Sequence, residues 1–333
     1  MPTVLVTGIS GFVGSHVTWK LLQSGFSVRG TVRSDAKAEQ VRTALSGIVN
    51  TEKLSIIAVP DMSVDSAFDL AVEKIDFVVH TASPFFYSGV TNASADLVDP
   101  ALNGVLSLLR SCAKSSVKRV VITSSIGALR CVTPTLPEGL SEVDWNLASI
   151  NTFRELGPET PAPVAYHASK TLAEKAAWDF VQSTNPTFDL VVINPPIIFG
   201  PIIHPCASPS QLNTSVKMVA DFYLHNTKEI DPLAAAGCID VRDVARAHVL
   251  ALTTPRASGQ RILISSGPFT QEMLVKVLEK HFPGRPYPSG FTIAVPIPEV
   301  TTKAALILGI TEYISLENMI VDTVWNLKNS FNI

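Results

Sequence analysis

The stretch Thr3–Gly14, which reads TVLVTGISGFVG, joins a short apolar strand to a glycine-rich turn and then to the start of a helix. A tight turn with positive φ needs glycine at Gly8, close approach to a pyrophosphate needs it at Gly11, and helix–strand packing needs it at Gly14. The free N–H groups at the start of the helix can bind phosphates. The GxxGxxG spacing at this junction predicts a dinucleotide site made of Gly8, Ile9, Ser10, Gly11, Phe12, Val13 and Gly14.

Apolar strand-like runs alternate with helical patterns from this turn as far as Asn194. Strands are predicted at 3–7, 27–32, 54–59, 76–80, 119–123 and 188–194, and helices at 12–24, 36–45, 64–72, 97–115 and 164–183. Strands that are apolar throughout and alternate with helices indicate a parallel sheet covered on both faces. The expected fold is therefore α/β, a Rossmann-type doubly wound parallel sheet.

The pattern changes after Asn194, where prolines cluster and the strand–helix alternation lapses. Helices are predicted at 208–225, 241–252 and 315–328, and one further strand at 261–265. We expect a small C-terminal substrate lobe whose segments interleave with the last elements of the sheet. The nucleotide-binding Rossmann domain would comprise 1–194 with returning segments at about 237–265, and the substrate-binding lobe 195–236 and 266–333.

The composition suits a protein with a sizeable core: of 333 residues, 46% are hydrophobic and 17% are charged, and the net charge is −3. That charge and the lack of a long basic run argue against a nucleic-acid partner. No apolar run reaches the roughly 18 residues that span a bilayer, and no basic segment precedes an apolar one at the start, so we expect no membrane partner and a cytoplasmic location. The cysteines form no CxxC pair and the histidines lack metal-ligand spacing, which predicts reduced thiols and no metal.

The end of the second predicted strand indicates which dinucleotide is bound. NAD-binding folds usually place an acidic residue there to hold the ribose 2′-hydroxyl, but here the strand ends in Val32-Arg33. Arg33 and Lys37 can both bind a 2′-phosphate, which favours NADP (as NADPH) over NAD. Further cofactor contacts are expected where later strands end, near the adenine at Asp61 and Met62 and near the nicotinamide at Thr81, Ala82 and Ser83.

A tyrosine and a lysine are spaced for proton transfer in a predicted helix. Tyr166 and Lys170 form a YxxxK motif, and a separation of four residues puts them on one helix face. A nearby ammonium stabilises the phenolate and lowers the pKa of a tyrosine from its usual value near 10. Ser124 and Ser125 follow the fifth predicted strand at the end where ligands bind, and a serine hydroxyl there can hold a substrate carbonyl.

These motifs resemble the extended short-chain dehydrogenase/reductase family along nearly the whole chain. The branch is similar to fungal NADPH-dependent aldehyde and ketone reductases of the yeast methylglyoxal/3-methylbutanal type, which are related to plant dihydroflavonol reductases. Matching phrases lie at 80–85, 103–105, 119–125, 173–178, 194–195, 199–201, 212–215 and 239–245. The resemblance implies Ser125, Tyr166 and Lys170 as catalytic residues, prefers Ser125 to Ser124, and adds cofactor contacts at Ile198 and Ser215. Family members differ at the position of Asn103, so that residue is left out of the site.

Two stretches depart from the pattern of that family. Pro196-Ile197 replaces a small or aromatic pair, and the loop 130–164 is long and proline-rich. The run Phe85–Tyr87 suits either the lining of an apolar pocket or packing in the core. The shape of the substrate pocket, the physiological substrate and the stereochemistry of the product therefore stay open.

Other polar residues are given structural roles. His167 follows Tyr166 directly, so we expect it to point to another face of the helix and to have a structural role. Asp240, Arg242 and Asp243 form a mixed charge cluster before a helix. We expect these three residues to cap the helix and to link the lobes through salt bridges.

The combination of a dinucleotide turn, a serine, a tyrosine and a lysine predicts an NADPH-dependent carbonyl reductase. Such an enzyme reduces a small-molecule aldehyde or ketone to an alcohol by hydride transfer with Tyr166 as proton donor, and it would be a monomer or homodimer. One alternative is a sugar-nucleotide epimerase or dehydratase on the same fold, which usually has an acidic residue after the second strand and basic residues in the C-terminal lobe. A second alternative, a non-enzymatic NADP-binding regulator, would not need the serine, tyrosine and lysine together.

Overall fold

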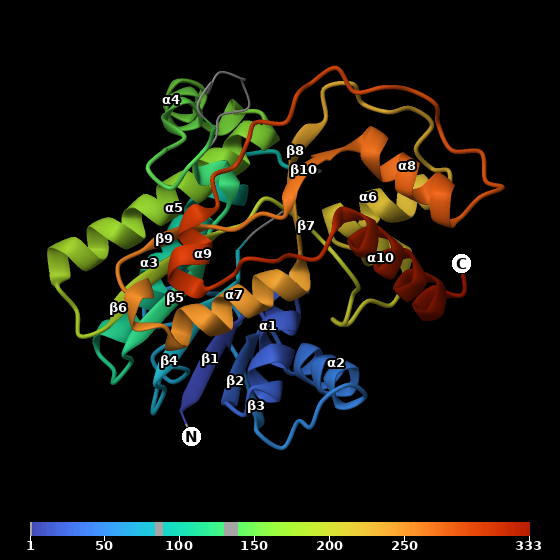
Figure 1. Ribbon diagram of the computed structural model, residues 1–333. Coiled ribbons are helices and arrows are strands. Elements are labelled where there is room, and N and C mark those ends of the chain that lie inside the picture. The colour runs from blue at the N-terminus through green and yellow to red at the C-terminus, as the bar shows by residue number, and fades with distance from the viewer. Residues whose placement is uncertain (1, 84–88, 130–138) are drawn as a thin grey trace.

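The computed structural model describes residues 2–83, 89–129 and 139–333. Its large sheet has seven parallel strands in the order β3-β2-β1-β4-β5-β6-β9 (Figure 1). The bounds of the strands are β1 (Thr3–Thr7), β2 (Ser27–Val32), β3 (Leu54–Ala58), β4 (Phe77–His80), β5 (Arg119–Thr123), β6 (Asp189–Asn194) and β9 (Arg261–Leu263). The prediction of a Rossmann-type α/β fold is confirmed.

Helices cover both faces of this sheet, as Figure 1 shows. One apolar core joins the sheet to α1 (Phe12–Gln23), α2 (Asp35–Ser46), α7 (Val241–Thr253) and α9 (Thr302–Leu308). The core on the other face joins it to α3 (Asp99–Ala113) and α5 (Ala162–Thr184), and α4 (Leu147–Leu156) packs on α5. Burial of both faces explains why the central strands are apolar throughout.

The order of the strands reverses between β1 and β4. These strands pair in parallel, so that Val4 lies opposite Phe77 and Thr7 opposite His80. The chain leaves β1 toward β2 on one side and reaches β4 on the other, so the connections diverge at the carboxyl ends of this pair. In open α/β sheets such a point forms the crevice in which ligands bind. The turns that follow Thr7 and His80 therefore border the expected ligand crevice.

A smaller sheet lies beside the carboxyl edge of the large one. It contains β7 (Ile197–Phe199), β8 (Ala235–Asp240) and β10 (Gly267–Thr270) in the order β10-β8-β7. A separate apolar core joins it to α6 (Thr214–Tyr223), α8 (Gln271–His281) and α10 (Leu316–Phe331). β8 falls largely within the 237–265 stretch expected to return to the Rossmann domain but pairs in the small sheet, whereas α7 and β9 return to the large one. The bounds of the two lobes stay a prediction.

Several expected elements differ from the structure. The predicted helix 64–72 is a series of turns, because Ser66 takes a φ of +64° and interrupts the helical ladder. A single helix was expected over 208–225, but a short turn at Pro209–Gln211 and extended backbone at Leu212 delay its start to Thr214. The sequence analysis missed β7, β8, β10, α4, α8 and α9, mostly short elements or elements in proline-rich surroundings.

The mixed charge cluster before α7 has the predicted role. Asp240 is fully buried, and its carboxylate accepts a hydrogen bond from the backbone N–H of Arg242 at 2.8 Å. The Arg242 guanidinium pairs with Asp240 at 2.7 Å and with Asp322 of α10 at 2.8 Å. Asp243 accepts from the backbone N–H of Ile314 at 2.8 Å. The cluster therefore caps α7 and ties it to the C-terminal helix.

Candidate active site

Glycine is required by packing at two positions of the turn after β1. Gly8 has a φ of +71°, and a Cβ placed there would lie 3.1 Å from Ala82 after β4. A Cβ at Gly14 would overlap the carbonyl oxygen of Gly8 and lie 2.8 Å from Thr81 Oγ1. Gly11 is the N-cap of α1, and no side chain caps that helix end. The first N–H groups of α1 are therefore available for a phosphate.

Ile9 contributes to this turn through its backbone. Its side chain is fully buried, and a Cβ at Gly30 of β2 would overlap Ile9 Cδ1. The turn can therefore sit tightly on the sheet because β2 has glycine at that position. The sequence analysis missed Gly30, although a glycine in the middle of an apolar strand often marks close packing of a neighbour.

The ends of β1 and β4 are fixed to each other by hydrogen bonds. Thr7 Oγ1 accepts from the backbone N–H groups of Thr81 and Ala82, each at 3.1 Å, and lies 2.8 Å from His80 Nδ1. The Thr81 hydroxyl donates to the carbonyl of Thr7 at 2.6 Å. Because Thr7 Oγ1 already accepts two hydrogen bonds, its proton points to His80 Nδ1, and His80 carries its own proton on Nε2. The predicted contacts Thr81 and Ala82 therefore lie directly beside the glycine turn, and Ser83 follows them in the chain.

Of the residues predicted at the adenosine end, Arg33 and Asp61 are exposed and Met62 is partly buried. Asp61 accepts from the N–H of Ser63 at 2.8 Å and from its hydroxyl at 2.6 Å. These bonds, and to a smaller extent the nearby Arg33 guanidinium, lower the pKa of Asp61. Arg33 at the end of β2 and Asp61 after β3 therefore face the same region. The Met62 side chain packs against α3, where a Cβ at Gly104 would lie 2.8 Å from Met62 Cε.

Lys37 lies in the first turn of α2, which Ser34 caps. Its charge acts on two groups of the loop after β7. Burial is the main reason that the pKa of His204 is lowered to about 4, and the charge of Lys37 contributes to that lowering. Burial raises the pKa of Cys206, and the charge of Lys37 reduces that rise. Lys37 is therefore near the 204–206 loop as well as near the end of β2. The sequence analysis did not anticipate this loop at the adenosine end.

Tyr166 and Lys170 lie one turn apart on α5, with the Lys170 ammonium 6.0 Å from the centre of the Tyr166 ring. Burial lowers the pKa of Lys170 to about 8, and the carboxylate of Glu174 opposes that shift. The pKa of His80 is lowered to about 3, mainly by burial and to a smaller extent by the charge of Lys170. The charge of Lys170 therefore acts on the end of β4, the strand that pairs with β1 before the glycine turn.

The two serines after β5 have different surroundings. Ser124 is buried, and its hydroxyl donates to Glu174 at 2.6 Å. Ser125 is partly exposed, and its Oγ accepts from the backbone N–H of Gly127 at 3.0 Å. The proton of the Ser125 hydroxyl can still be donated to a ligand, whereas that of Ser124 is engaged. The geometry therefore favours Ser125 over Ser124 as the residue that contacts a substrate.

The His167 side chain lies against the turn that begins at Ser125. A Cβ at Gly127 would lie 2.9 Å from His167 Cδ2 and 3.3 Å from Ser125 Oγ. The rings of His167 and Tyr166 are 5.7 Å apart between centroids. A tight turn after β5 brings Gly127 against α5, which a helical wheel of α5 alone could not indicate.

The last two predicted contacts come together from the small sheet and α6. Ser215 Oγ is hydrogen-bonded to the carbonyl of Ile198, and it accepts from Asn213 Nδ2 at 3.0 Å. Both Ile198 and Ser215 are partly exposed. The run Phe85–Tyr87 and part of the loop 130–164 lie outside the described residues, so their predicted place at the substrate pocket has no structural account.

Buried ionic residues near the site were not recognised in the sequence. Glu174 of α5 and Arg261 of β9 form an ion pair beneath the serines, with side chains 1% and 10% exposed. A glutamate four residues after Lys170, and so on the same helix face, was a local signal of this pair. Its partner is 87 residues away in the sequence and could not be identified from spacing.

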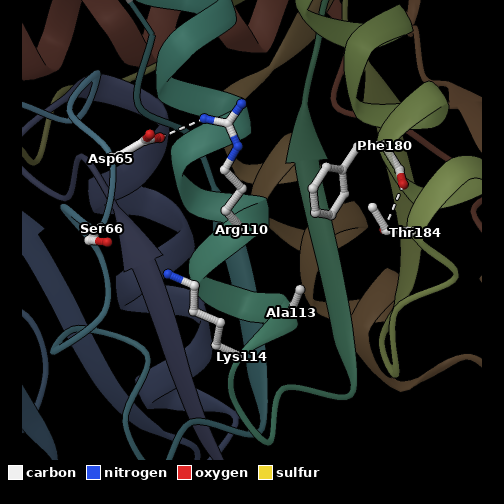
Figure 2. Close-up of a pocket in the computed structure, with 7 residues that line it drawn as sticks. All are labelled: Asp65, Ser66, Arg110, Ala113, Lys114, Phe180 and Thr184. Carbon is white, nitrogen blue, oxygen red and sulfur yellow. Dashed lines mark hydrogen bonds and ion pairs between the residues drawn. The ribbon is translucent and has the colours of Figure 1, made fainter.

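A surface cavity of about 310 Å³ lies away from these residues. Figure 2 shows it between the last turns of α3 and α5. Its lining includes the paired charges of Arg110 and Asp65, with Phe180 on the other side. Strand β5 begins just after α3 ends, so this cavity is at the edge of the sheet opposite Ser125. Among the described residues, no helix is long and apolar enough to cross a membrane, and no cluster of three or more metal-ligating side chains occurs.

The chain is similar to known proteins along most of its length. Residues 4–265 match the sequence profile of the NAD dependent epimerase/dehydratase family. The chain is 36% identical to the NADPH-dependent methylglyoxal reductase GRE2 of Saccharomyces cerevisiae, over 84% of this chain and 83% of that protein. It is 37% identical to the cinnamoyl-CoA reductase CAD2 of Medicago truncatula, over 98% and 95%. The crystal structure of yeast methylglyoxal/isovaleraldehyde reductase Gre2 complexed with NADPH is similar over 98% of each chain, with a TM-score of 0.87 and 32% identity.

Proposed function

Since the chain belongs to the NAD dependent epimerase/dehydratase family, we propose that it is an NADPH-dependent oxidoreductase that reduces aldehydes or ketones to alcohols. The observation that carries this proposal is that α5, which holds Tyr166 and Lys170 one turn apart, packs on the turn that begins at Ser125 after β5. Relatives whose names describe reductases of carbonyl compounds and the similarity to a structure complexed with NADPH give it independent support.

The residues present fit a phosphorylated dinucleotide. The turn at Gly8 and Gly14 leaves no room for a Cβ, and the start of α1 has no capping side chain, as a bound pyrophosphate requires. Arg33 is exposed at the end of β2, where an NAD-binding protein usually has an acidic residue. Arg33 and Lys37 would hold the 2′-phosphate, and Lys170 would hold the nicotinamide ribose. NADPH bound in this place supplies a hydride.

Within the site, Ser125, Tyr166 and Lys170 would act on the substrate oxygen in different ways. The Ser125 hydroxyl would donate to the carbonyl oxygen of the substrate and hold it next to Tyr166. As hydride adds to the carbonyl carbon and its C–O π bond breaks, the oxygen takes the proton of the Tyr166 hydroxyl. The product is an alcohol, and the phenolate left on Tyr166 is stabilised by the Lys170 ammonium until a proton from solvent restores it.

The activity is tested by following the absorbance of NADPH with a panel of small aldehydes and ketones, with NADH in parallel. We expect oxidation of NADPH that depends on the carbonyl compound and formation of the matching alcohol. No oxidation with any carbonyl compound would contradict the proposal. Turnover of a sugar nucleotide without net oxidation of the cofactor would instead identify an epimerase or dehydratase.

A further inference from the structure

The carboxylate of Glu174 connects the ends of two strands behind Ser125. Its Oε2 accepts hydrogen bonds from Ser124 Oγ at 2.6 Å and from Asn194 Nδ2 at 2.8 Å. Asn194 Nδ2 also donates to the carbonyl oxygen of Ser125 at 3.2 Å. One oxygen of a buried helix side chain thus fixes the residue that follows β5 and the last residue of β6.

The other oxygen of Glu174 binds Arg261 Nε, and Arg261 connects the network to the segment 139–146. Arg261 Nη1 donates to the carbonyl oxygens of Glu142 at 2.7 Å and Asp144 at 2.9 Å. The guanidinium carbon lies 3.6 Å from the centre of the Trp145 ring, a cation–π contact. A long, proline-rich loop is therefore anchored to the sheet at this segment.

The same segment reaches Ser125 by a second route. Asn146 is buried, and its Nδ2 donates to the carbonyl of Gly127 at 2.9 Å, while its N–H donates to the carbonyl of Ala128 at 2.9 Å. Gly127 and Ala128 form the turn that begins at Ser125. The segment 139–146 is thus connected to both sides of the residue that would hold the substrate carbonyl.

We propose that Glu174 and Arg261 are positioning residues for carbonyl reduction, which fix Ser125 and the segment 139–146 relative to α5. This inference rests on the proposed function. A buried ion pair is no more stabilising than well-packed apolar side chains of the same volume. Apolar residues would make none of the directed hydrogen bonds to Ser124, Asn194 and the two carbonyls of the segment. Misplacement of a reacting group by about 1 Å can cost on the order of a hundredfold in rate.

A second arginine–carboxylate pair, at the starts of β5 and β6, provides a control, with its carboxylate 33% exposed where that of Glu174 is 1% exposed. Arg119 and Asp189 are the first residues of β5 and β6, and they form two hydrogen bonds at 2.6 and 2.8 Å. Arg119 Nη1 also donates to the carbonyl oxygens of Ala251 at 2.8 Å and Thr254 at 2.7 Å. This pair has the same chemistry as Glu174–Arg261 but lies at the opposite ends of the two strands, away from Ser125.

The test compares Glu174→Gln with Asp189→Asn, two changes of a carboxylate to an amide. For each we measure the melting temperature, the Kd of NADPH by fluorescence, and kcat and KM for one reducible ketone. Both variants should melt earlier. Glu174→Gln should lower kcat by about tenfold to a hundredfold with the Kd of NADPH within about twofold, whereas Asp189→Asn should leave kcat and KM within about twofold.

Two milder variants keep the inference testable if Glu174→Gln does not fold. Asn194→Ala removes the link to the Ser125 carbonyl and should lower kcat by about tenfold. Arg261→Lys keeps a cation beside Glu174 but cannot reach both loop carbonyls, so KM for the ketone should rise more than kcat falls. Folded Glu174→Gln or Asn194→Ala with the wild-type kcat, or an equal loss in Asp189→Asn, would overturn the inference. A wild type that reduces no carbonyl would instead overturn the proposed function.

Discussion

The Lys170 ammonium lies 6.0 Å from the centre of the Tyr166 ring, and burial lowers the pKa of Lys170 to about 8. The neighbouring His80 is kept neutral, since burial and then the charge of Lys170 lower its pKa to about 3. At neutral pH, therefore, Lys170 is charged and His80 is not. A cation held this close to a phenol stabilises the phenolate, which is the form that Tyr166 takes after giving up its proton.

Replacing Tyr166 by phenylalanine removes the proposed proton donor and little else. General acid catalysis typically contributes 10²- to 10⁴-fold, so kcat should fall by about that factor. The Kd of NADPH, measured by fluorescence titration, should stay within about twofold of the wild type because the ring is retained. A Tyr166→Phe variant with nearly the wild-type kcat would show that another group donates the proton.

The activity should fall at alkaline pH as Lys170 loses its charge. Because the pKa of Lys170 is lowered to about 8, the ammonium is present below that pH and is lost above it. We therefore expect kcat/KM for the ketone to decrease above about pH 8. Lys170→Ala should be far less active at all pH values, should lack this alkaline decrease, and should bind NADPH more weakly. An unchanged Kd would remove the proposed ribose contact, and a wild-type profile that is flat to pH 10 would contradict the role of the ammonium.

Much of the fold could be predicted because its signals are local. The GxxGxxG turn, the apolar strands and the helices between them each depend on residues within one element, and the extended short-chain dehydrogenase/reductase resemblance that these motifs carry is confirmed. Elements that depend on distant partners were missed. β7, β8 and β10 are three- to six-residue strands stabilised by one another, and the apolar pattern at 64–72 was read as a helix although Ser66 takes a positive φ.

The candidate site divides in the same way. The YxxxK spacing is sufficient to propose Tyr166 and Lys170, and the family resemblance favours Ser125 over Ser124. The bond of Ser124 to Glu174 is visible only in the structure. Other features could not be inferred, because they exist only when strands and loops meet. Glycine is needed at Gly30 because the Ile9 side chain packs against it. Glu174 is buried as an ion pair with Arg261, which is 87 residues away in the sequence.

Buried histidines should make the protein less stable as the pH falls below neutral. Burial lowers the pKa to about 4 for His16, His204 and His248, and to about 3 for His80. The unfolded chain takes up protons near pH 6.5, which the folded chain does not until the pH approaches these values. The free energy of unfolding is therefore unaffected above pH 6.5 and falls below it, by about 1.4 kcal/mol per pH unit for each histidine.

His248→Gln provides the measurement, since glutamine can replace both hydrogen bonds without titrating. His248 Nδ1 lies 2.8 Å from the Val244 carbonyl, and Nε2 lies 2.7 Å from Thr123 Oγ1. Urea unfolding between about pH 5 and 6.5 should give an average slope shallower by about 1 kcal/mol per pH unit than in the wild type. Equal slopes in the two proteins would mean that His248 titrates alike in the folded and unfolded chains.

The choice of cofactor depends on Arg33. It is exposed at the end of β2, and its charge acts on Asp61 after β3, so it faces the region where the adenosine should lie. A charge-assisted guanidinium–phosphate contact is worth about 1.5–3 kcal/mol, or roughly tenfold to a hundredfold in affinity. Arg33→Asp should raise KM for NADPH by at least that factor, because repulsion is added to the lost contact.

NADH should suffer far less from Arg33→Asp than NADPH does. The 2′-hydroxyl of NADH has no charge to repel the new carboxylate, which can instead accept a hydrogen bond from it. Lys37 would still bind the 2′-phosphate in part, so one substitution should reduce the preference for NADPH without fully reversing it. The measurement is kcat/KM for both cofactors in wild type and variant at constant ionic strength, because exposed charges are screened. A wild type that prefers NADH, or a variant with an unchanged ratio, would make Arg33 a surface cation with no part in cofactor selection.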